Sequence, residues 1–192
     1  MKKPLLLILI VFSFVDCKKF PGPLPAIQTS LPTISSKIDT IPDKAAFGLE
    51  LAKDSINTDE TLFIFNHKAS TAYFLGDAAY FPGFGQVSLA SISSDGHDLA
   101  INSTPYIPGR PIGLDVHTKA SGAFLFKISY ENHIPSYIQV WLVDTYLEDS
   151  VDVRSENYNF TVSKSDTNSF GNERFKVVVK ENMQQQTASM HY

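Results

Sequence analysis

The sequence contains a single cysteine, Cys17, and a single tryptophan among its 192 residues. One thiol cannot form an intramolecular disulfide, and it cannot build a zinc site that needs several thiolates. Charged residues are also few, at 19% of the chain, and they leave a formal net charge of −4. Nucleic-acid-binding domains are usually strongly basic, so this charge balance argues against nucleic acid as a partner.

Motifs of common catalytic sites are missing as well. No Gly-x-Ser-x-Gly segment occurs, and the one cysteine stands in the N-terminal region. Gly83-Phe84-Gly85 lacks the third glycine and the following helix of a phosphate-binding loop. We therefore expect a protein that is not an enzyme and that holds no cofactor. A hydrolase with dispersed carboxylates is the remaining enzymatic alternative, because spacing alone does not place carboxylates in space.

Metal binding is not expected, although two local groupings keep it open as an alternative. The five histidines form no zinc pattern in the sequence, but His117 shares a strand face with Asp115. Four carboxylates crowd the connection between Asp144 and Asp152, where oxygen ligands for calcium would be available. No acidic loop of defined spacing is present there, so the pattern favours a charged surface turn.

The N-terminus has the layout of an export signal. Lys2 and Lys3 precede an apolar run that begins at Leu5, and this run is too short to span a bilayer comfortably. Cys17 follows the run, where it resembles the acylated cysteine of a bacterial lipobox, although Asp16 stands where a small residue is usual. We predict a signal over residues 1–16, lipidation of Cys17, and a surface-exposed location on the outer membrane. The alternative is an ordinary cleaved signal whose cysteine has no role.

A proline-rich segment follows over residues 17–43. Its five prolines lie among serine, threonine and isolated aliphatic residues, without helical or strand periodicity. Such segments favour extended conformations at about 3 Å per residue, so it could reach roughly 70 Å. We interpret it as a spacer between the lipid anchor and a folded domain. Alternatively, part of it packs along the domain as an extra strand.

Alternating apolar and polar residues dominate the segment 44–181, which we expect to form a single domain. Phe124, Phe126 and Ile128, for example, alternate with Leu125, Lys127 and Ser129. Period-two alternation repeated at short spacing predicts an all-β fold, here an antiparallel β-sandwich of about eight to ten strands, of the jelly-roll or immunoglobulin-like kind. The final residues 182–192 are polar and patternless, and we expect a flexible tail.

Aromatic residues are concentrated in one segment that reads as a loop, residues 73–84, with five aromatic rings in twelve residues. Rings on a loop can stack on sugars or anchor a protein partner. The candidate ligand-binding residues are Tyr73, Tyr80, Phe81 and Phe84, with Arg110 of a second loop as a polar contact. The alternative is that these rings only cap an open end of the core.

The order of several strand-like pieces resembles a β-sandwich domain that recurs in large surface proteins of the bacteroidetal type. Among the pieces are Asp59-Glu60-Thr61-Leu62-Phe63-Ile64-Phe65-Asn66, Val140-Trp141-Leu142-Val143-Asp144 and Arg174-Phe175-Lys176-Val177. The resemblance covers roughly residues 47–179 and implies a surface-exposed, adhesin-associated domain without an established catalytic role. This chain is shorter than those proteins and lacks their C-terminal sorting domain, which a lipid anchor would replace.

The same bacterial group is associated with O-glycosylation at Asp-Ser/Thr followed by an aliphatic residue. Three places resemble this pattern, with acceptors at Thr40, Ser55 and Ser150. Together, these features suggest a lipid-anchored surface protein that binds a protein partner or a glycan, as an accessory subunit of an outer-membrane assembly. The alternative is a carbohydrate-binding module that uses the aromatic loop 73–84.

Overall fold

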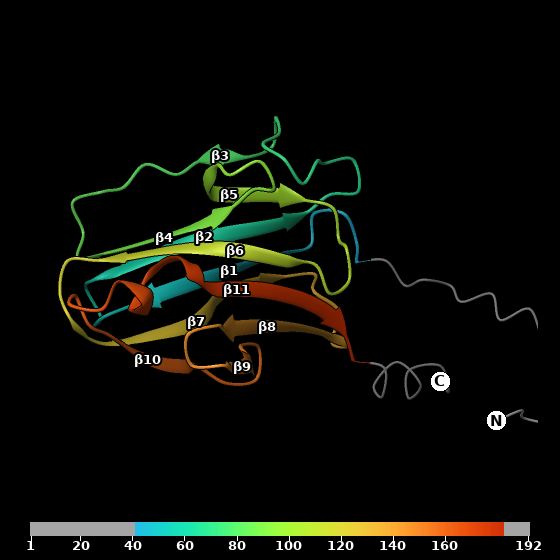
Figure 1. Ribbon diagram of the computed structural model, residues 1–192. Coiled ribbons are helices and arrows are strands. Elements are labelled where there is room, and N and C mark those ends of the chain that lie inside the picture. The colour runs from blue at the N-terminus through green and yellow to red at the C-terminus, as the bar shows by residue number, and fades with distance from the viewer. Residues whose placement is uncertain (1–40, 183–192) are drawn as a thin grey trace, which may run out of the picture. The chain divides into compact units, whose positions relative to one another are not determined.

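The computed structural model describes residues 41–182, and strands account for all the regular structure there except one short 3-10 helix. The expected all-β class is confirmed, with eleven strands rather than eight to ten (Figure 1). The strands are β1 (Ala46–Ala52), β2 (Thr58–Phe65), β3 (Ala78–Ala79), β4 (Val87–Ile92), β5 (Asp98–Thr104), β6 (Pro111–Thr118), β7 (Gly122–Asn132), β8 (Ile138–Asp144), β9 (Asp149–Asp152), β10 (Tyr158–Val162) and β11 (Gly171–Glu181). The 3-10 helix η1 (Thr167–Ser169) precedes β11. Over the same residues, no helix has the length and apolar character needed to cross a bilayer.

The strands are joined in one sheet, and a sandwich of two separate sheets is not confirmed. Neighbouring strands follow the order β10-β7-β1-β2-β5-β4-β6-β11-β8-β9, and β3 pairs with β5 outside this path. The pairing is antiparallel except between β2 and β5, which run parallel. The sheet curls into a nearly closed, barrel-like shape, so that its inner face encloses the core (Figure 1).

The core follows from the alternation seen in the sequence. Along β8, Ile138, Val140 and Leu142 are buried, while the residues between them are partly exposed. Phenylalanine rings from several strands meet inside, and the rings of Phe47 and Phe63 stack with centroids 4.7 Å apart. Burial of each such side chain stabilises the fold by about 1.5–3 kcal/mol.

A buried polar cluster lies where β2 and β4 diverge and β5 starts. β5 pairs with β4 at Leu99 and with β2 at Ile101, so β2 and β4 share one neighbour. Thr61 donates to Oγ of Ser91 at 3.0 Å, and Nδ2 of Asn102 donates to the same oxygen at 3.3 Å. These contacts satisfy polar groups that would otherwise be buried without partners.

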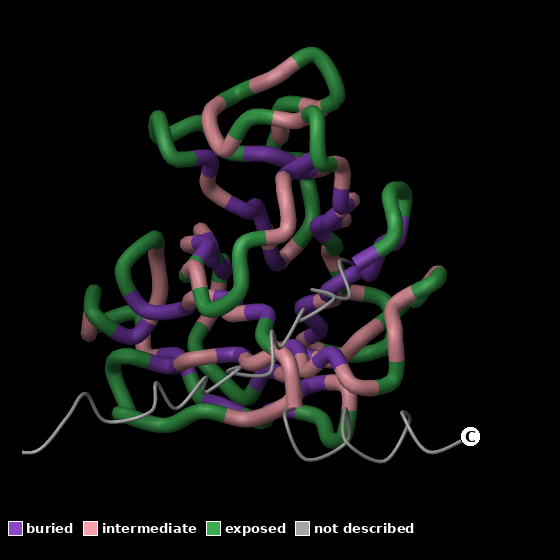
Figure 2. The backbone as a smooth tube through the Cα atoms, turned by 90° about the vertical axis from the view of Figure 1, so that its right-hand side faces the viewer, coloured by how far each residue is buried: buried purple, intermediate pink, exposed green. Residues whose placement is uncertain are grey.

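The chain enters and leaves the sheet at the same end, which Figure 2 views face on. Ile41 is buried in the core, and Asp43 accepts a hydrogen bond from the backbone N–H of His67 at 2.9 Å. After β11, the N–H of Asn182 donates to the carbonyl of Tyr137 at 2.7 Å. The signal, Cys17 and most of the proline-rich spacer lie outside the described residues, as does the tail beyond Asn182.

Candidate functional site

The opposite end of the sheet carries a group of connecting segments. They are the turn 53–57 between β1 and β2, the segment 80–86 that enters β4, the turn 119–121 between β6 and β7, and the segment 163–170 that leads into β11. We call this end the loop end. It lies at the left of Figure 1, away from the two ends of the described chain.

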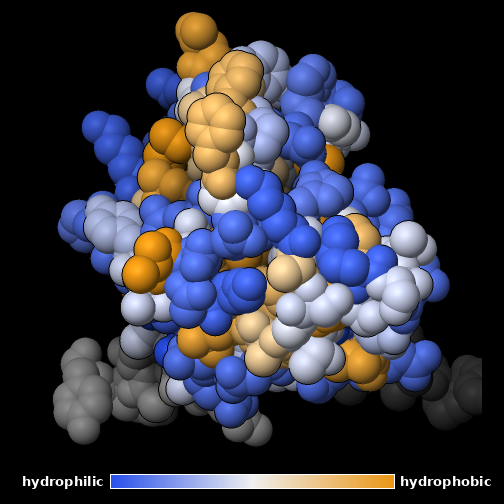
Figure 3. Space-filling model, turned by 90° about the vertical axis from the view of Figure 1, so that its left-hand side faces the viewer, coloured by the Kyte–Doolittle hydropathy of each residue, from blue (hydrophilic) through white to orange (hydrophobic). Residues whose placement is uncertain are grey.

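Three large apolar side chains of the loop end are almost completely exposed. The exposed fractions are 87% for Ile56, 83% for Phe81 and 102% for Phe84. We call these three residues the apolar tip. Figure 3 views this end, and its upper part, where the segment between β3 and β4 runs, carries a group of apolar side chains. Single exposed apolar residues are common on proteins, but a group of them marks an interaction site.

One carboxylate connects the two segments that bear the apolar tip. Asp59 of β2 accepts hydrogen bonds from the hydroxyl of Tyr80 at 2.5 Å and from the N–H of Leu89 at 2.9 Å. Burial, followed by the hydrogen bond to Asp59, raises the pKa of Tyr80 to about 12. Asp59 follows Ile56 by three residues and Tyr80 directly precedes Phe81, so this contact holds the two segments against each other.

The segment 80–86 is also fixed on its other side. Nζ of Lys119, in the β6–β7 turn, donates to the backbone carbonyl of Phe84 at 2.8 Å. Pro82 restricts the backbone between the two phenylalanines, and a Cβ added to Gly83 would have no neighbouring atom within 4 Å. The segment is therefore bonded to the rest of the domain at the Tyr80 hydroxyl and at the Phe84 carbonyl, while the side chains of Phe81 and Phe84 are exposed.

Hydrogen bonds within the turn 53–57 fix its backbone, with Ile56 at the exposed tip of the turn. The Asp54 carboxylate accepts hydrogen bonds from the backbone N–H groups of Ile56 and Asn57, both at 2.9 Å, and also from the Asn57 side chain. These hydrogen bonds, foremost that from the Asn57 N–H, hold the pKa of Asp54 below its usual value. The turn exposes Ile56 at its tip, with Ser55 beside it.

The five residues selected from the sequence do not form one site. Tyr80, Phe81 and Phe84 share the segment 80–86, but the Tyr80 hydroxyl is occupied by Asp59. Arg110 precedes β6 and donates from Nη2 to Oγ1 of Thr104 at 2.6 Å. Lys119 and Phe84 lie at the other end of this eight-residue strand, about 25 Å away at 3.3 Å per residue.

Tyr73 makes its contacts with the β4–β5 turn. Its ring stacks on that of His97 with centroids 5.1 Å apart, and its N–H donates to Oδ1 of Asp95 at 2.9 Å. Hydrogen bonds, led by that from the Ser93 hydroxyl, lower the pKa of Asp95 to about 2. Tyr73 is therefore held at this turn by contacts of its own.

Ile56 and Lys119 belong to the loop end but were not selected from the sequence. An aliphatic residue in a polar turn reads as incidental, and a lysine after a strand reads as solvated. The Asp54-Ser55-Ile56-Asn57 turn does carry a usable signal, because Asp and Asn favour tight turns that place the residue between them at the surface. The contact between Lys119 and Phe84 joins residues 35 positions apart and has no local signature.

The predicted modification sites fall in different places. Ser55 is exposed in the β1–β2 turn, and Ser150 is exposed on β9, where it pairs with Val143 of β8. Thr40 and Cys17 lie outside the described residues, so their modification stays a prediction.

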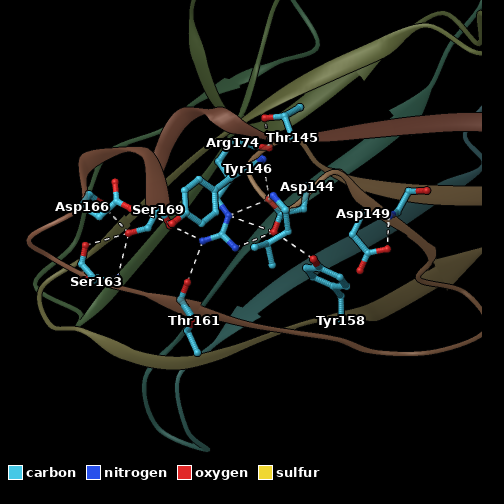
Figure 4. Close-up of polar contacts among 12 residues, drawn as sticks. Asp144, Thr145, Tyr146, Asp149, Tyr158, Thr161, Ser163, Asp166, Ser169 and Arg174 are labelled. Carbon is cyan, nitrogen blue, oxygen red and sulfur yellow. Dashed lines mark hydrogen bonds and ion pairs between the residues drawn. The ribbon is translucent and has the colours of Figure 1, made fainter.

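Of the four carboxylates between Asp144 and Asp152, Asp144 belongs to a buried network (Figure 4), whereas Glu148 and Asp149 are exposed. Arg174 of β11, 2% exposed, donates to Asp144 from Nε at 3.0 Å and from Nη2 at 2.7 Å. The Tyr158 hydroxyl donates to the same carboxylate at 3.0 Å, and Nη1 of Arg174 donates to the carbonyl of Thr161 at 2.9 Å. The network thus links β8 and β11 to β10, which is the end strand of the sheet.

The network uses Asp144, which is one member of the cluster that suggested calcium. The Asp144 carboxylate also accepts the N–H groups of the following turn, at Tyr146 and Leu147. Within residues 41–182, no group of three or more His, Cys, Asp or Glu side chains is arranged to hold a metal ion. Asp115 contacts Nε2 of His117 at 2.9 Å as an isolated pair.

The site therefore combines an exposed apolar tip with a backbone fixed from both sides. Its chemistry is that of a contact surface, since the groups that project from it are hydrocarbon. No known protein family, curated protein or solved structure matches this chain.

Proposed function

We propose that this protein is a lipid-anchored binding protein of the bacterial cell surface, and that its loop end binds a component of the outer membrane. One observation carries this proposal: Phe81 and Phe84 are 83% and 102% exposed on a segment that is bonded through the Tyr80 side chain to Asp59 of β2 and through the Phe84 carbonyl to Lys119. In this proposal the lipid anchor is Cys17, which follows the apolar run that we predict to be an export signal. Its partner there is a protein of an outer-membrane assembly or a glycan.

Pre-organisation makes the loop end suited to binding. A flexible loop loses conformational entropy when it is ordered in a complex, and this loss weakens affinity. The contacts of Tyr80 with Asp59 and of Lys119 with Phe84 hold the segment in place before any partner arrives. Aromatic side chains also dominate the binding energy of many interfaces, because each removes a large apolar surface from water.

The hydrogen bonds made by the carboxylates fit a protein that binds a partner better than one that catalyses a reaction. Asp59 and Asp144 each accept several hydrogen bonds from the fold itself, and Asp144 is also paired with Arg174. Each therefore has a structural role, and the loop end presents hydrocarbon side chains. We accordingly propose a non-enzymatic role.

A crosslinked pull-down from native membranes tests this proposal. We expect the wild-type protein to capture a partner, and the Phe81→Ala/Phe84→Ala variant to lose at least tenfold of it. Tyr130→Ala is the matched control, because Tyr130 is an exposed aromatic residue (49%) on β7, away from the loop end. Equal capture by the wild type and the Phe81→Ala/Phe84→Ala variant would refute the loop end as the binding surface.

The same variants separate a protein partner from a glycan. Binding on a glycan array that disappears with Phe81→Ala/Phe84→Ala would support the glycan. Tyr80→Ala is unsuitable for this purpose, because it removes the hydroxyl that bonds Asp59 and so disturbs the segment itself.

A further inference from the structure

We infer that the apolar tip inserts into the anionic phospholipid bilayer that holds the protein's own lipid anchor. The inference rests on the proposed function, in which the loop end is the binding surface for a protein or glycan of the outer membrane, and it adds that the hydrocarbon side chains of that surface enter the lipid beside this partner. It identifies a second membrane contact that would orient the folded domain.

The shape of the apolar tip is the first reason. Ile56 belongs to the turn 53–57 and the two phenylalanines belong to the segment 80–86, so the tip consists of projections from separate segments. A protein partner would need a matching pocket for each projection, because interface cores are packed as closely as protein interiors. Lipid chains and headgroups rearrange around separate side chains, and aromatic residues are favoured in the interfacial layer of a bilayer.

The charges at the loop end are the second reason. Three lysines, Lys53, Lys119 and Lys164, belong to the segments of this end, although the chain as a whole has a formal net charge of −4. The carboxylates of these segments are Asp54 and Asp166, so three lysines against two aspartates give the four segments together one net positive charge. Lysines close to a membrane surface are attracted by anionic headgroups, and a flexible stem lets an ammonium group reach them from a surface contact, such as that of Lys119 with Phe84 or that of Lys164 with the ring of Phe170.

The chain length outside the described residues is the third reason. Ile41 lies at the end opposite the loop end, and 23 residues lie between it and Cys17. Fully extended, this segment could span about 70 Å. The longest strands have eleven residues, which corresponds to about 36 Å. The spacer is therefore long enough for the loop end to reach the bilayer in which the anchor sits.

Fluorescence quenching in reconstituted vesicles tests the inference. The lipidated full chain would be placed in vesicles of phosphatidylethanolamine and phosphatidylglycerol, with an environment-sensitive label on Phe84→Cys. Acylation of Cys17 leaves the introduced thiol as the only one to react. We expect brominated acyl chains to quench this label at least twofold. A label on Ile56→Cys should behave likewise, and one on Tyr130→Cys should not respond.

The same quenching assay also tests whether the lysines of the loop end contribute to membrane binding. Lys53→Glu/Lys164→Glu should reduce the quenching at position 84, and vesicles of neutral phosphatidylcholine should do the same with the wild-type lysines. Labels at 84 and 56 that are quenched no more than the label at 130 would overturn the inference. If the Phe81→Ala/Phe84→Ala variant then still loses a captured protein, the proposed function stands with that protein as partner. If the Phe81→Ala/Phe84→Ala variant captures as much protein as the wild type, both the membrane inference and the proposed binding surface are refuted.

Discussion

Tyr80 illustrates how the role of a residue depends on a partner far away in the sequence. On sequence alone, Tyr80 belongs with Phe81 and Phe84 as an exposed ring for ligand contact. In the structure its hydroxyl donates to Asp59, 21 residues earlier, at 2.5 Å. The two phenylalanines have no hydroxyl to be captured in this way, and they remain exposed.

The raised pKa of Tyr80 gives a pH-dependent prediction. An ordinary tyrosine ionises near pH 10, whereas the pKa of Tyr80 in the folded protein is about 12. Between these values the folded chain holds a proton that the unfolded chain releases, so this contribution to stability is complete below pH 10 and is lost as the pH rises towards 12. Urea unfolding at pH 8 and pH 11 should show a smaller loss of stability for Tyr80→Phe than for the wild type. If the wild type and Tyr80→Phe lose the same unfolding free energy between pH 8 and pH 11, the raised pKa of Tyr80 is contradicted.

The buried ion pair gives a second prediction at the residue scale. Arg174→Met leaves the Asp144 carboxylate buried without its charge partner, and such changes cost about 3–5 kcal/mol. Lys127→Met is the matched control, because Lys127 forms a more exposed pair with Glu50 at 3.1 Å, of a kind worth about 0–1 kcal/mol. The double variant Asp144→Leu/Arg174→Met should recover most of the stability. Equal effects of Arg174→Met and Lys127→Met in denaturant titrations would argue against a structural role for the network.

At the scale of elements, the sequence predicts strands whose inner residues are apolar. β6, β8 and β10 belong to this group, since apolar residues recur at every second position. β5 is harder to predict, because Asn102, Ser103 and Thr104 are buried although they are polar. Asn102, for example, bonds Ser91 of β4. The parallel pairing of β2 with β5 has no local signal, because alternation says which face is buried and not which strand lies beside it.

Gly48 of β1 provides a test of how closely the strands pack on the outer face. A Cβ at this position would lie 2.5 Å from Oγ of Ser129 and 3.0 Å from Oε2 of Glu60, which are hydrogen-bonded to each other. We expect Gly48→Ala to destabilise the protein by about 1–3 kcal/mol, because these side chains must move. The effect should be smaller in a Ser129→Ala background, which removes the obstructing oxygen.

Gly83 is the control for this substitution. No atom lies within 4 Å of a Cβ built there, so Gly83→Ala should change the free energy of unfolding by less than about 0.5 kcal/mol. Chemical denaturation of the four variants measures both effects. If Gly48→Ala destabilises the protein equally in the wild-type and Ser129→Ala backgrounds, the expected clash with the Ser129 side chain is refuted.

At the scale of the whole molecule, an anchor predicted from the sequence is combined with an exposed apolar tip that we propose to be a contact surface. The sequence indicated the all-β class and the aromatic segment, because both depend on local patterns. It could not indicate the loop end, which is assembled from segments that only the curled sheet brings to one place, including Ile56 and Lys119. The resemblance to bacteroidetal surface domains stays a prediction.

The anchor is tested by cell fractionation. Cys17→Ala removes the thiol that would be acylated, and each acyl methylene buried in a membrane contributes about 0.8 kcal/mol. We expect the variant to move from the membrane fraction to the soluble fraction, and mass spectrometry of the wild type to show an acylated N-terminal cysteine. Unchanged partitioning of the variant would argue against the lipid anchor.

Photocrosslinking in intact cells tests most directly whether the apolar tip is the contact surface. A photoreactive amino acid would replace Phe84 in one variant and Tyr130 in another, both exposed aromatic positions at different places on the domain. The account expects strong lipid or protein adducts from position 84 and few from position 130. Equal labelling from the two positions, or adducts from position 130 alone, would contradict it.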